Sequence, residues 1–197
     1  MDRKILIAAS AAMMLSACQP SDGGNDAMAN GTAPDGQVTA QSGDTKNPPK
    51  TAIFAAATQT ADLSVLVRAI KAAGLEQALA DPGPYTVFAP TDAAFKKLAP
   101  GTADAWMQPD RKAQLTGIIT YHLVPGVVTA ADLRSAMERG DGKTQLATIS
   151  GGTLALSRDG NAIVVTDGGG GKARVTEADL TQSNGVIHKI DTVLVPR

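Results

Sequence analysis

The spacing of apolar residues changes midway along the chain, and this change constrains the possible folds more than any other feature. Over residues 63–70, apolar side chains recur at intervals of three and four, which is typical of an amphipathic helix. Over residues 153–157 and 162–166, apolar and polar residues alternate, as in strands with one buried face. Helices that precede strands indicate an α+β fold rather than alternating βαβ units.

Capping signals place the helices more closely. Asp62 is the expected N-cap of the first helix, and Gly74 is the expected stop after it. A second helix is predicted over residues 111–122, with one apolar face. Between these two, a short helix should begin at Thr91 or Asp92, because either side chain can accept a hydrogen bond from a free backbone N–H in the first turn.

Turn residues separate the predicted strands. A short strand is expected over 85–88, just before Pro90 and the expected cap at Thr91 or Asp92. In the second half, residues 158–161 predict a four-residue hairpin loop, and the glycines at 168–171 predict another turn. A third turn at 184–185 leads into a final apolar stretch over 186–195.

The N-terminus has the pattern of an export signal. The basic pair at 3–4 precedes an apolar run over 5–15, which is too short to span a membrane but suits a signal peptide. The run ends in Leu15-Ser16-Ala17-Cys18, which resembles the bacterial lipobox and contains the only cysteine of the chain. We therefore predict a signal peptide over 1–17 and lipid attachment at Cys18. The alternative is a plain secretory signal in which the cysteine is incidental.

A polar segment follows the cysteine and predicts a tether. Residues 18–47 are rich in Gly, Asn, Asp, Pro and Thr and contain almost no large apolar residue, so we expect disorder. A flexible coil of this length spans about 30 Å, enough to hold a domain clear of lipid headgroups. Gln19 stands where inner-membrane lipoproteins usually carry Asp. The expected location is therefore the outer membrane, with the domain on the cell surface or on the periplasmic face.

Composition and motifs exclude several classes of function. The chain has 18 basic and 19 acidic residues, and only 3% of its residues are aromatic, so a nucleic-acid partner is not expected. One cysteine and two histidines are too few for a zinc site, and no metal or cofactor is expected. Residues 142–144 look like the end of a phosphate-binding loop, but the first glycine of that motif is missing. No catalytic triad context is recognisable, so the chain is not expected to be an enzyme.

Three blocks of the sequence resemble the fasciclin (FAS1) domain family. Residues 86–95 resemble the family's first signature, residues 184–191 resemble its second, and Tyr121-His122 stands where the family has its Tyr-His pair. The resemblance covers residues 48–197. It implies a β-wedge of two small sheets packed against a cluster of helices. It also implies an adhesion module that binds other proteins or extracellular matrix.

The same resemblance suggests where a partner could bind. In the family, an Asp followed by an aliphatic residue before the second signature is linked to receptor binding, and Asp179-Leu180 takes that place here. We expect this pair in a surface connection, although Leu180 pointing inward is the structural alternative. Tyr121 is expected to be partly exposed and is a further candidate. His122 and His188 lie on apolar faces and are expected to be core histidines, with His122 kept as a candidate for binding.

Two functions remain open at this point. The first is a lipid-anchored envelope protein whose single, monomeric fasciclin domain mediates adhesion or protein and matrix interaction. The second is a periplasm-facing lipoprotein that binds a small ligand or a membrane-protein partner. The length of the tether suits either.

Overall fold

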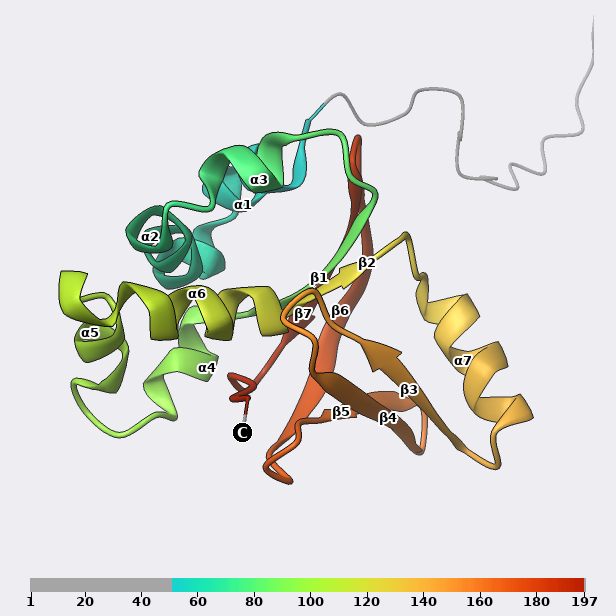
Figure 1. Cartoon of the computed structure of the whole chain (residues 1–197). Coiled ribbons are helices and arrows are strands. Elements are labelled where there is room, and N and C mark those ends of the chain that lie inside the picture. Colours follow the sequence, from blue (N-terminus) through green and yellow to red (C-terminus); the bar gives the residue numbers. More distant parts are fainter. Residues whose placement is uncertain (1–50, 197) are drawn as a thin grey trace, which may run out of the picture. The chain divides into compact units, whose positions relative to one another are not determined.

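The computed structural model describes residues 51–196, in which six helices gather on one side and a seventh stands apart from them (Figure 1). Two short 3-10 turns, Ala61–Leu63 and Pro109–Arg111, lead into α2 and α6. The α-helices are α1 (Ile53–Gln59), α2 (Ser64–Ala73), α3 (Glu76–Ala80), α4 (Asp92–Lys96), α5 (Thr102–Trp106), α6 (Lys112–Tyr121) and α7 (Ala130–Arg139).

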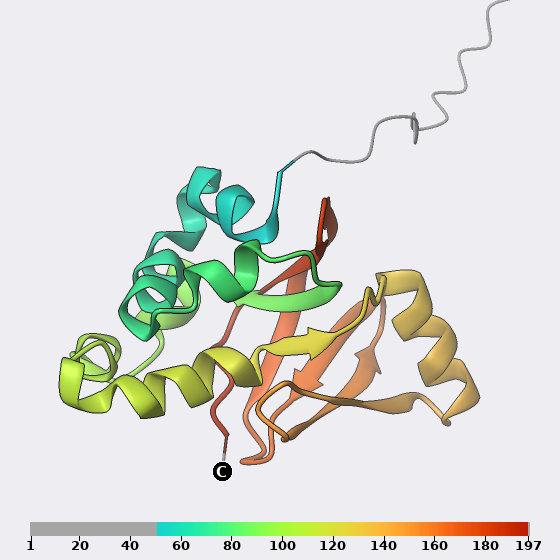
Figure 2. The ribbon, with the colours of Figure 1, turned by 45° about the horizontal axis from the view of Figure 1, so that its top comes forward.

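The described strands form one seven-stranded sheet in the order β2-β1-β7-β6-β5-β4-β3 (Figure 2). The β1–β7 pair is parallel, and all other neighbours are antiparallel. The strands are β1 (Tyr85–Pro90), β2 (Leu123–Pro125), β3 (Lys143–Ala147), β4 (Thr153–Asp159), β5 (Ala162–Thr166), β6 (Lys172–Gln182) and β7 (Gly185–Ile190).

The α+β class and the helical cluster are confirmed, but the expectation of two separate small sheets is not. The reason lies in β6, whose 11 residues serve two partners. Its first residues pair with β5, and the rest of the strand pairs with β7. The sheet also curls until its two edges nearly meet: the backbone N–H of Ile149, just after β3, donates to the carbonyl of Leu123 in β2 at 2.8 Å. The result is one nearly closed sheet.

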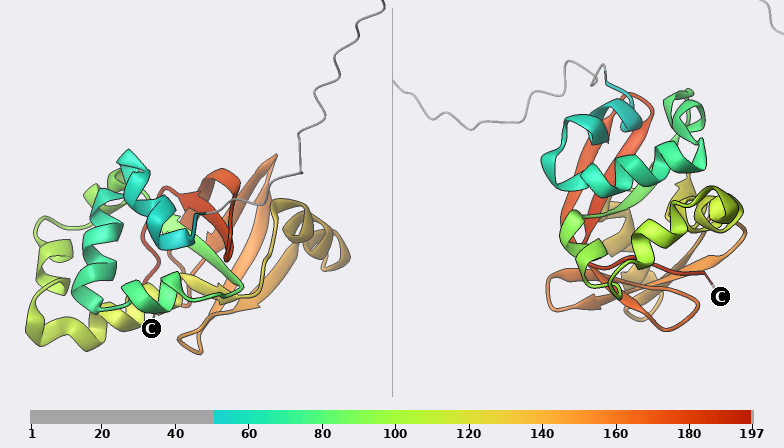
Figure 3. Two further views of the ribbon diagram at one scale, coloured as in Figure 1. Left: turned by 90° about the horizontal axis from the view of Figure 1, so that it is seen from above. Right: turned by 90° about the vertical axis from the view of Figure 1, so that its left-hand side faces the viewer.

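Two hydrophobic cores fill the domain. One lies between the helices α1–α6 and the strands β1 and β7, and includes Leu66, Ile70 and Ile187. The other lies between α7 and the inner faces of β4, β5 and β6, and includes Leu133 and Leu156. The views in Figure 3 show the helical cluster and α7 at opposite ends of the molecule. The sheet is therefore covered by helices at two separate places.

Asn184 links the first residues of the domain to the turn between β6 and β7. Its side-chain oxygen accepts from the backbone N–H of Ile53 at 2.8 Å, and its amide group donates to the carbonyls of Leu79 and Asp81, each at 2.9 Å. The backbone N–H of Ser183 also donates to the carbonyl of Thr51 at 3.0 Å. The first described residues are thereby fixed to the far end of the chain.

The predicted helix ends are partly confirmed. Gly74 ends α2 with a left-handed φ of 73°, and Thr91 caps α4 by accepting from the N–H of Ala94 at 3.3 Å. The prediction that Asp62 caps α2 is wrong, because a 3-10 turn precedes the helix and Asp62 instead forms an ion pair with Lys189 at 3.1 Å. Asp92, from α4, accepts from the N–H of Val65 at 2.9 Å in its place.

The predicted strands at 85–88, 153–157 and 162–166 are confirmed, but the hairpin loop at 158–161 is shorter than expected. Asp159 pairs with Ala162, so only Gly160 and Asn161 form the loop. The predictions for the signal peptide, Cys18 and the tether lie outside the described residues. Within residues 51–196, no single helix is long and apolar enough to cross a membrane; α1 and α2 pass that test only together, with a bend of 107° between them.

Candidate functional site

Asp179 and Leu180 lie inside strand β6, so the prediction of a connection between strands is wrong, although Asp179 is at the surface as expected. Glu177 pairs with Lys189 and Leu180 with Ile187, which leaves two residues of β6 opposite the single residue His188. Such an extra residue is a β-bulge, a feature that bends a strand and redirects its side chains. Asp179 takes up the bend with a left-handed φ of 60°, a conformation that Asp and Asn tolerate better than most residues.

The bulge places the Asp179 carboxylate at the start of α7. Its Oδ1 accepts from the backbone N–H of Ala130, the first residue of that helix, at 2.7 Å. A negative charge there is favourable because the free N–H groups of a helix N-terminus are partly positive. The rest of Asp179 is exposed, whereas Leu180 is half-buried and packs against the helical core. The structural alternative for Leu180, an inward-pointing side chain, therefore holds.

His188 lies directly behind the bulge and is a core residue, as predicted. Its side chain is 0% exposed. Nε2 lies 2.8 Å from the carbonyl of Val128, and Nδ1 accepts from the backbone N–H of Asp179 at 3.2 Å. Since a carbonyl only accepts, the ring proton is assigned to Nε2. Burial lowers the pKa of His188, while the Val128 carbonyl and the Asp179 charge act in the opposite direction.

Tyr121 is buried, and the prediction of partial exposure is wrong. It is 2% exposed at the last turn of α6. Its hydroxyl donates to the carbonyl of Thr153 and accepts from the N–H of Gly168, both at 2.9 Å. The ring lies so close to Gly152 that a Cβ at that position would collide with it. Tyr121 therefore ties α6 to the β4 strand and to the turn after β5.

His122 is the buried core histidine that its apolar face predicts. It is 1% exposed, with Nδ1 2.8 Å from the carbonyl of Ile118 and Nε2 accepting from the backbone N–H of Leu194 at 3.1 Å. Burial lowers its pKa to about 4, against smaller opposing contributions from the Ile118 carbonyl and the charge of Asp167. The neutral ring thus joins the end of α6 to the C-terminal segment.

The four candidate residues fall into two separate groups. Tyr121 and His122 belong to one hydrogen-bonded group with the turn after β5 and the C-terminal segment, where Asp167 also accepts from the N–H of Val195 at 3.1 Å. Asp179 belongs to the other group, with His188 and the start of α7. Of the four, only Asp179 is exposed. The bulge is therefore accessible from solvent, and the Tyr-His pair is not.

The helix that gives Asp179 its setting was not predicted from the sequence. Thr129 is the N-cap of α7, and its side chain and that of Asp132 form a reciprocal capping box. This spacing of Thr and Asp three residues apart, followed by an apolar residue, was the available signal. Within residues 51–196, no group of three or more His, Cys, Asp or Glu side chains could hold a metal ion.

The domain combines a nearly closed mixed sheet, helices at two ends and a buried Tyr-His pair. Comparison with known protein families and solved structures identifies the class of domain that has this architecture. The fasciclin domain family model matches residues 61–196. A solved FAS1 domain pair from the insect cell adhesion molecule fasciclin I superposes with a TM-score of 0.67 at 21% identity, over 75% of this chain and 51% of that chain.

Relatives found by sequence support the same family assignment. Protein sll1483 of Synechocystis sp. is 43% identical over 134 residues, which cover 68% of this chain and 67% of that protein. The transforming growth factor-beta-induced protein ig-h3 of Sus scrofa is 33% identical over 133 residues, and the match covers only 17% of its length. Immunogenic protein MPT70 of Mycobacterium tuberculosis is 33% identical, over 51% of its length. The chain belongs to the fasciclin domain family.

Proposed function

We propose that this chain is an exported, lipid-anchored envelope protein whose fasciclin domain mediates adhesion by binding a protein or matrix component. The observation that carries the proposal is one combination in a single chain: a lipobox ending at Cys18, a polar segment, and a fasciclin domain. The solved structural neighbour comes from a cell adhesion molecule, and a domain displayed on a lipid anchor is placed to act in the same way.

Within the domain, the exposed carboxylate of Asp179 is the proposed contact point. The bulge and the start of α7 hold it in one position, so little conformational entropy is lost when a partner binds. Leu180 is half-buried and supports the bulge by packing against the helical core, so it is not part of the proposed contact. A donor group such as Arg or Lys on the partner is the matching chemistry, because a carboxylate accepts charge-assisted hydrogen bonds.

Protease treatment of intact cells tests the display of the domain. If the domain faces outward, an added protease removes it while a periplasmic marker survives. If it is protected until the outer membrane is opened, the periplasm-facing alternative holds.

Cys18→Ser tests the lipid anchor. This variant should not be lipidated and should remain as unprocessed precursor, so mature membrane-bound protein from it would contradict the lipid anchor.

Two matched substitutions test the contact point. Asp179→Asn keeps an oxygen for the Ala130 N–H and tolerates the left-handed backbone, but it removes the charge. Asp141→Asn is its control, because Asp141 is also exposed and has a left-handed φ of 51°. We expect attachment of cells to matrix extract to fall about tenfold or more for Asp179→Asn only, a size typical of a central interface residue. Equal attachment for both variants would remove Asp179 from the proposal.

A further inference from the structure

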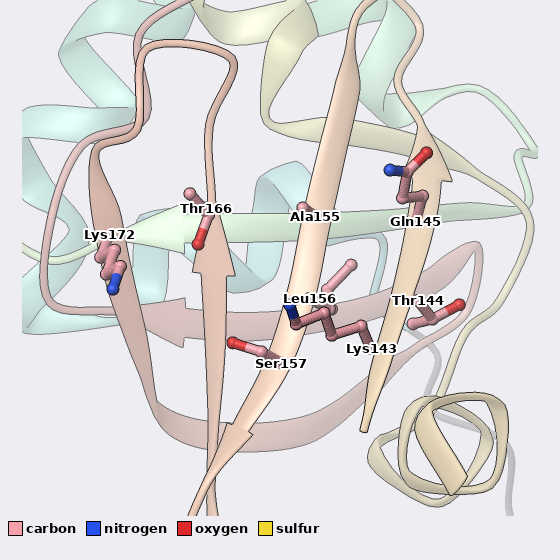
Figure 4. Close-up of a pocket in the computed structure, with 8 residues that line it drawn as sticks. All are labelled: Lys143, Thr144, Gln145, Ala155, Leu156, Ser157, Thr166 and Lys172. Atoms are coloured by element: carbon pink, nitrogen blue, oxygen red, sulfur yellow. The ribbon is translucent and has the colours of Figure 1, made fainter. Parts of the chain in front are cut away.

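The outer face of strands β3, β4, β5 and β6 carries a shallow hollow of about 470 Å³ (Figure 4). The inner face of β4, β5 and β6 packs against the second core, so the side chains that alternate with the core residues point outward. Small side chains make the floor of the hollow: Ala155 and Ser157 on β4, and Thr166 on β5. Lys143 and Lys172 stand at its two sides.

Strand register fixes how these residues are arranged. Gln145, Ala155, Thr166 and Lys172 are successive partners and form one row across the four strands. Lys143 and Ser157 are partners in the next row, two residues further along the strands. With strands about 4.8 Å apart and residues about 3.3 Å apart, the two lysine Cα atoms lie roughly 16 Å apart at diagonal corners. In Figure 4 the Lys143 side chain reaches in over β4, between the two lysines' strands.

The charge of the hollow is one-sided. No Asp or Glu is among its lining residues, and neither lysine takes part in an ion pair within residues 51–196. Arg174, on the neighbouring row of β6, is paired with Asp159 and adds no free charge. In a domain whose overall charge is balanced, this face therefore presents two unneutralised ammonium groups with hydroxyl and amide groups between them.

We propose that this face binds a linear acidic polysaccharide, a chain of sugars bearing carboxylate or sulfate groups. Two separate cations on different strands, with Cα atoms about 16 Å apart, match an anion that repeats along a chain better than a single phosphate or carboxylate. The Ser157, Thr166 and Gln145 groups between them can exchange hydrogen bonds with sugar hydroxyls. Leu156, the one large apolar residue of the lining, is 1% exposed and offers little surface to a peptide anchor, and the lining has no aromatic ring on which a nucleobase could stack.

This hollow is separate from the bulge at Asp179, and the two share no residue. The polysaccharide face therefore goes beyond the proposed protein contact, and either could fail without the other. A domain with both would bind the sugar and the protein components of a matrix through different surfaces.

The test uses the full chain in neutral detergent and measures binding to immobilised alginate, a polymer of uronic acids, with neutral dextran as the reference. Lys143→Gln with Lys172→Gln should weaken alginate binding about tenfold or more and reduce its salt dependence, because two ion contacts are lost. Lys71→Gln with Lys96→Gln is the matched control: it removes the same charge from exposed lysines on α2 and α4, and should bind as the unaltered chain does.

A substitution that leaves the charge unchanged tests whether the face recognises the sugar hydroxyls as well as the acidic groups. Thr166→Val keeps the shape of the side chain but removes its hydroxyl, and should weaken alginate binding several-fold. The proposal is overturned if the Lys143/Lys172 variant binds alginate normally, or if the Lys71/Lys96 control weakens binding equally. It is also overturned if poly-glutamate or vesicles of anionic phospholipid bind through Lys143 and Lys172 as tightly as alginate. Tight binding of poly-glutamate would mean that the face recognises an acidic peptide, and tight binding of the vesicles would mean that it recognises a membrane.

Discussion

The two histidines of this chain are equally buried, yet they hold different parts of the domain through opposite ring nitrogens. His122 donates from Nδ1 to its own helix and accepts at Nε2 from the C-terminal segment. His188 donates from Nε2 to the loop before α7 and accepts at Nδ1 from the bulge. Each neutral ring thus connects two backbone segments that are far apart in the sequence, and neither has a nitrogen left for a ligand.

The segments held by the two histidine rings differ in the number of other hydrogen bonds that hold them in place. The loop before α7 is also held by the Thr86 hydroxyl, which accepts from the N–H of Val128 at 2.9 Å, and by Asp179. The C-terminal segment beside His122 has, in addition, the contact between Val195 and Asp167 at an exposed position. Loss of one ring should therefore matter more at His122. The following predictions test this difference.

The largest effect is expected for His122→Ala. This change opens a cavity and leaves the Leu194 N–H and the Ile118 carbonyl without their partner, which should lower the free energy of unfolding by about 3 kcal/mol. Urea denaturation at neutral pH measures this, and amide exchange at Leu194 should accelerate more than exchange at Asp179. A variant as stable as the parent, or one with unchanged exchange at Leu194, would contradict the role given to His122.

Acidification should act mainly through the same residue. The pKa of His122 in the folded domain is about 4, below its ordinary value of 6.5, so the unfolded chain binds more protons. The stabilisation is complete above pH 6.5 and is lost as the pH falls toward 4. Between pH 7 and pH 5 the loss from this group is about 2 kcal/mol. His188 shifts in the same direction, and Asp167 and Asp179 are the charges that oppose the two shifts.

Denaturation curves at several pH values check this prediction, with His122→Ala as the reference. That variant should show a shallower loss of stability between pH 7 and pH 5 than the parent. Parallel pH profiles would assign the acid sensitivity to other groups.

A smaller effect is expected at the bulge. Asp179→Ala removes the acceptor for the Ala130 N–H and places alanine in a left-handed conformation, at a cost of about 1.5 kcal/mol. Asp179→Asn, which keeps both features, should stay within about 0.5 kcal/mol of the parent. Thermal unfolding of the pair measures the difference. Equal stability of the two variants would show that the carboxylate does not hold α7.

The smallest effect is expected for Tyr121→Phe. The ring still fills its place, but the Thr153 carbonyl and the Gly168 N–H lose their partner, which should cost about 1 kcal/mol. Urea denaturation resolves a change of this size. Gly152→Ala makes a stricter test of the same packing, since the added Cβ must displace the ring and should destabilise the domain more than Tyr121→Phe. The reverse order would mean that the ring moves aside.

The local elements that the sequence predicted correctly are those with their own signals nearby. Gly74 and Thr91 end and begin helices through their own backbone and side chain, and the alternation over 153–157 needs only its immediate neighbours. What could not be predicted depends on partners far along the chain. Asp92 caps a helix 27 residues earlier, and Asp179 meets Ala130 across 49 residues.

The same reason explains the candidate site. The second signature drew attention to Asp179, but nothing near it in the sequence shows that it lies in a strand opposite His188. The exposure expected for Tyr121 failed because Gly152 and Gly168, far along the chain, close over its ring. The hollow between Lys143 and Lys172 requires the register of four strands, of which β3 and β6 were not predicted.

The clasp that Asn184 forms around the first described residues has a mechanical consequence. A pulling force applied at Thr51 is transmitted directly to the turn between β6 and β7, because Thr51 and Ile53 are hydrogen-bonded there. If the opposing force acts on the outer face of β3–β6, the load runs lengthwise along β6 and β7. Hydrogen bonds between strands sheared lengthwise share the load, whereas bonds pulled apart at one end break in turn. If the domain is held by a lipid anchor, as proposed, tension on the anchor would load β6 and β7 in this way.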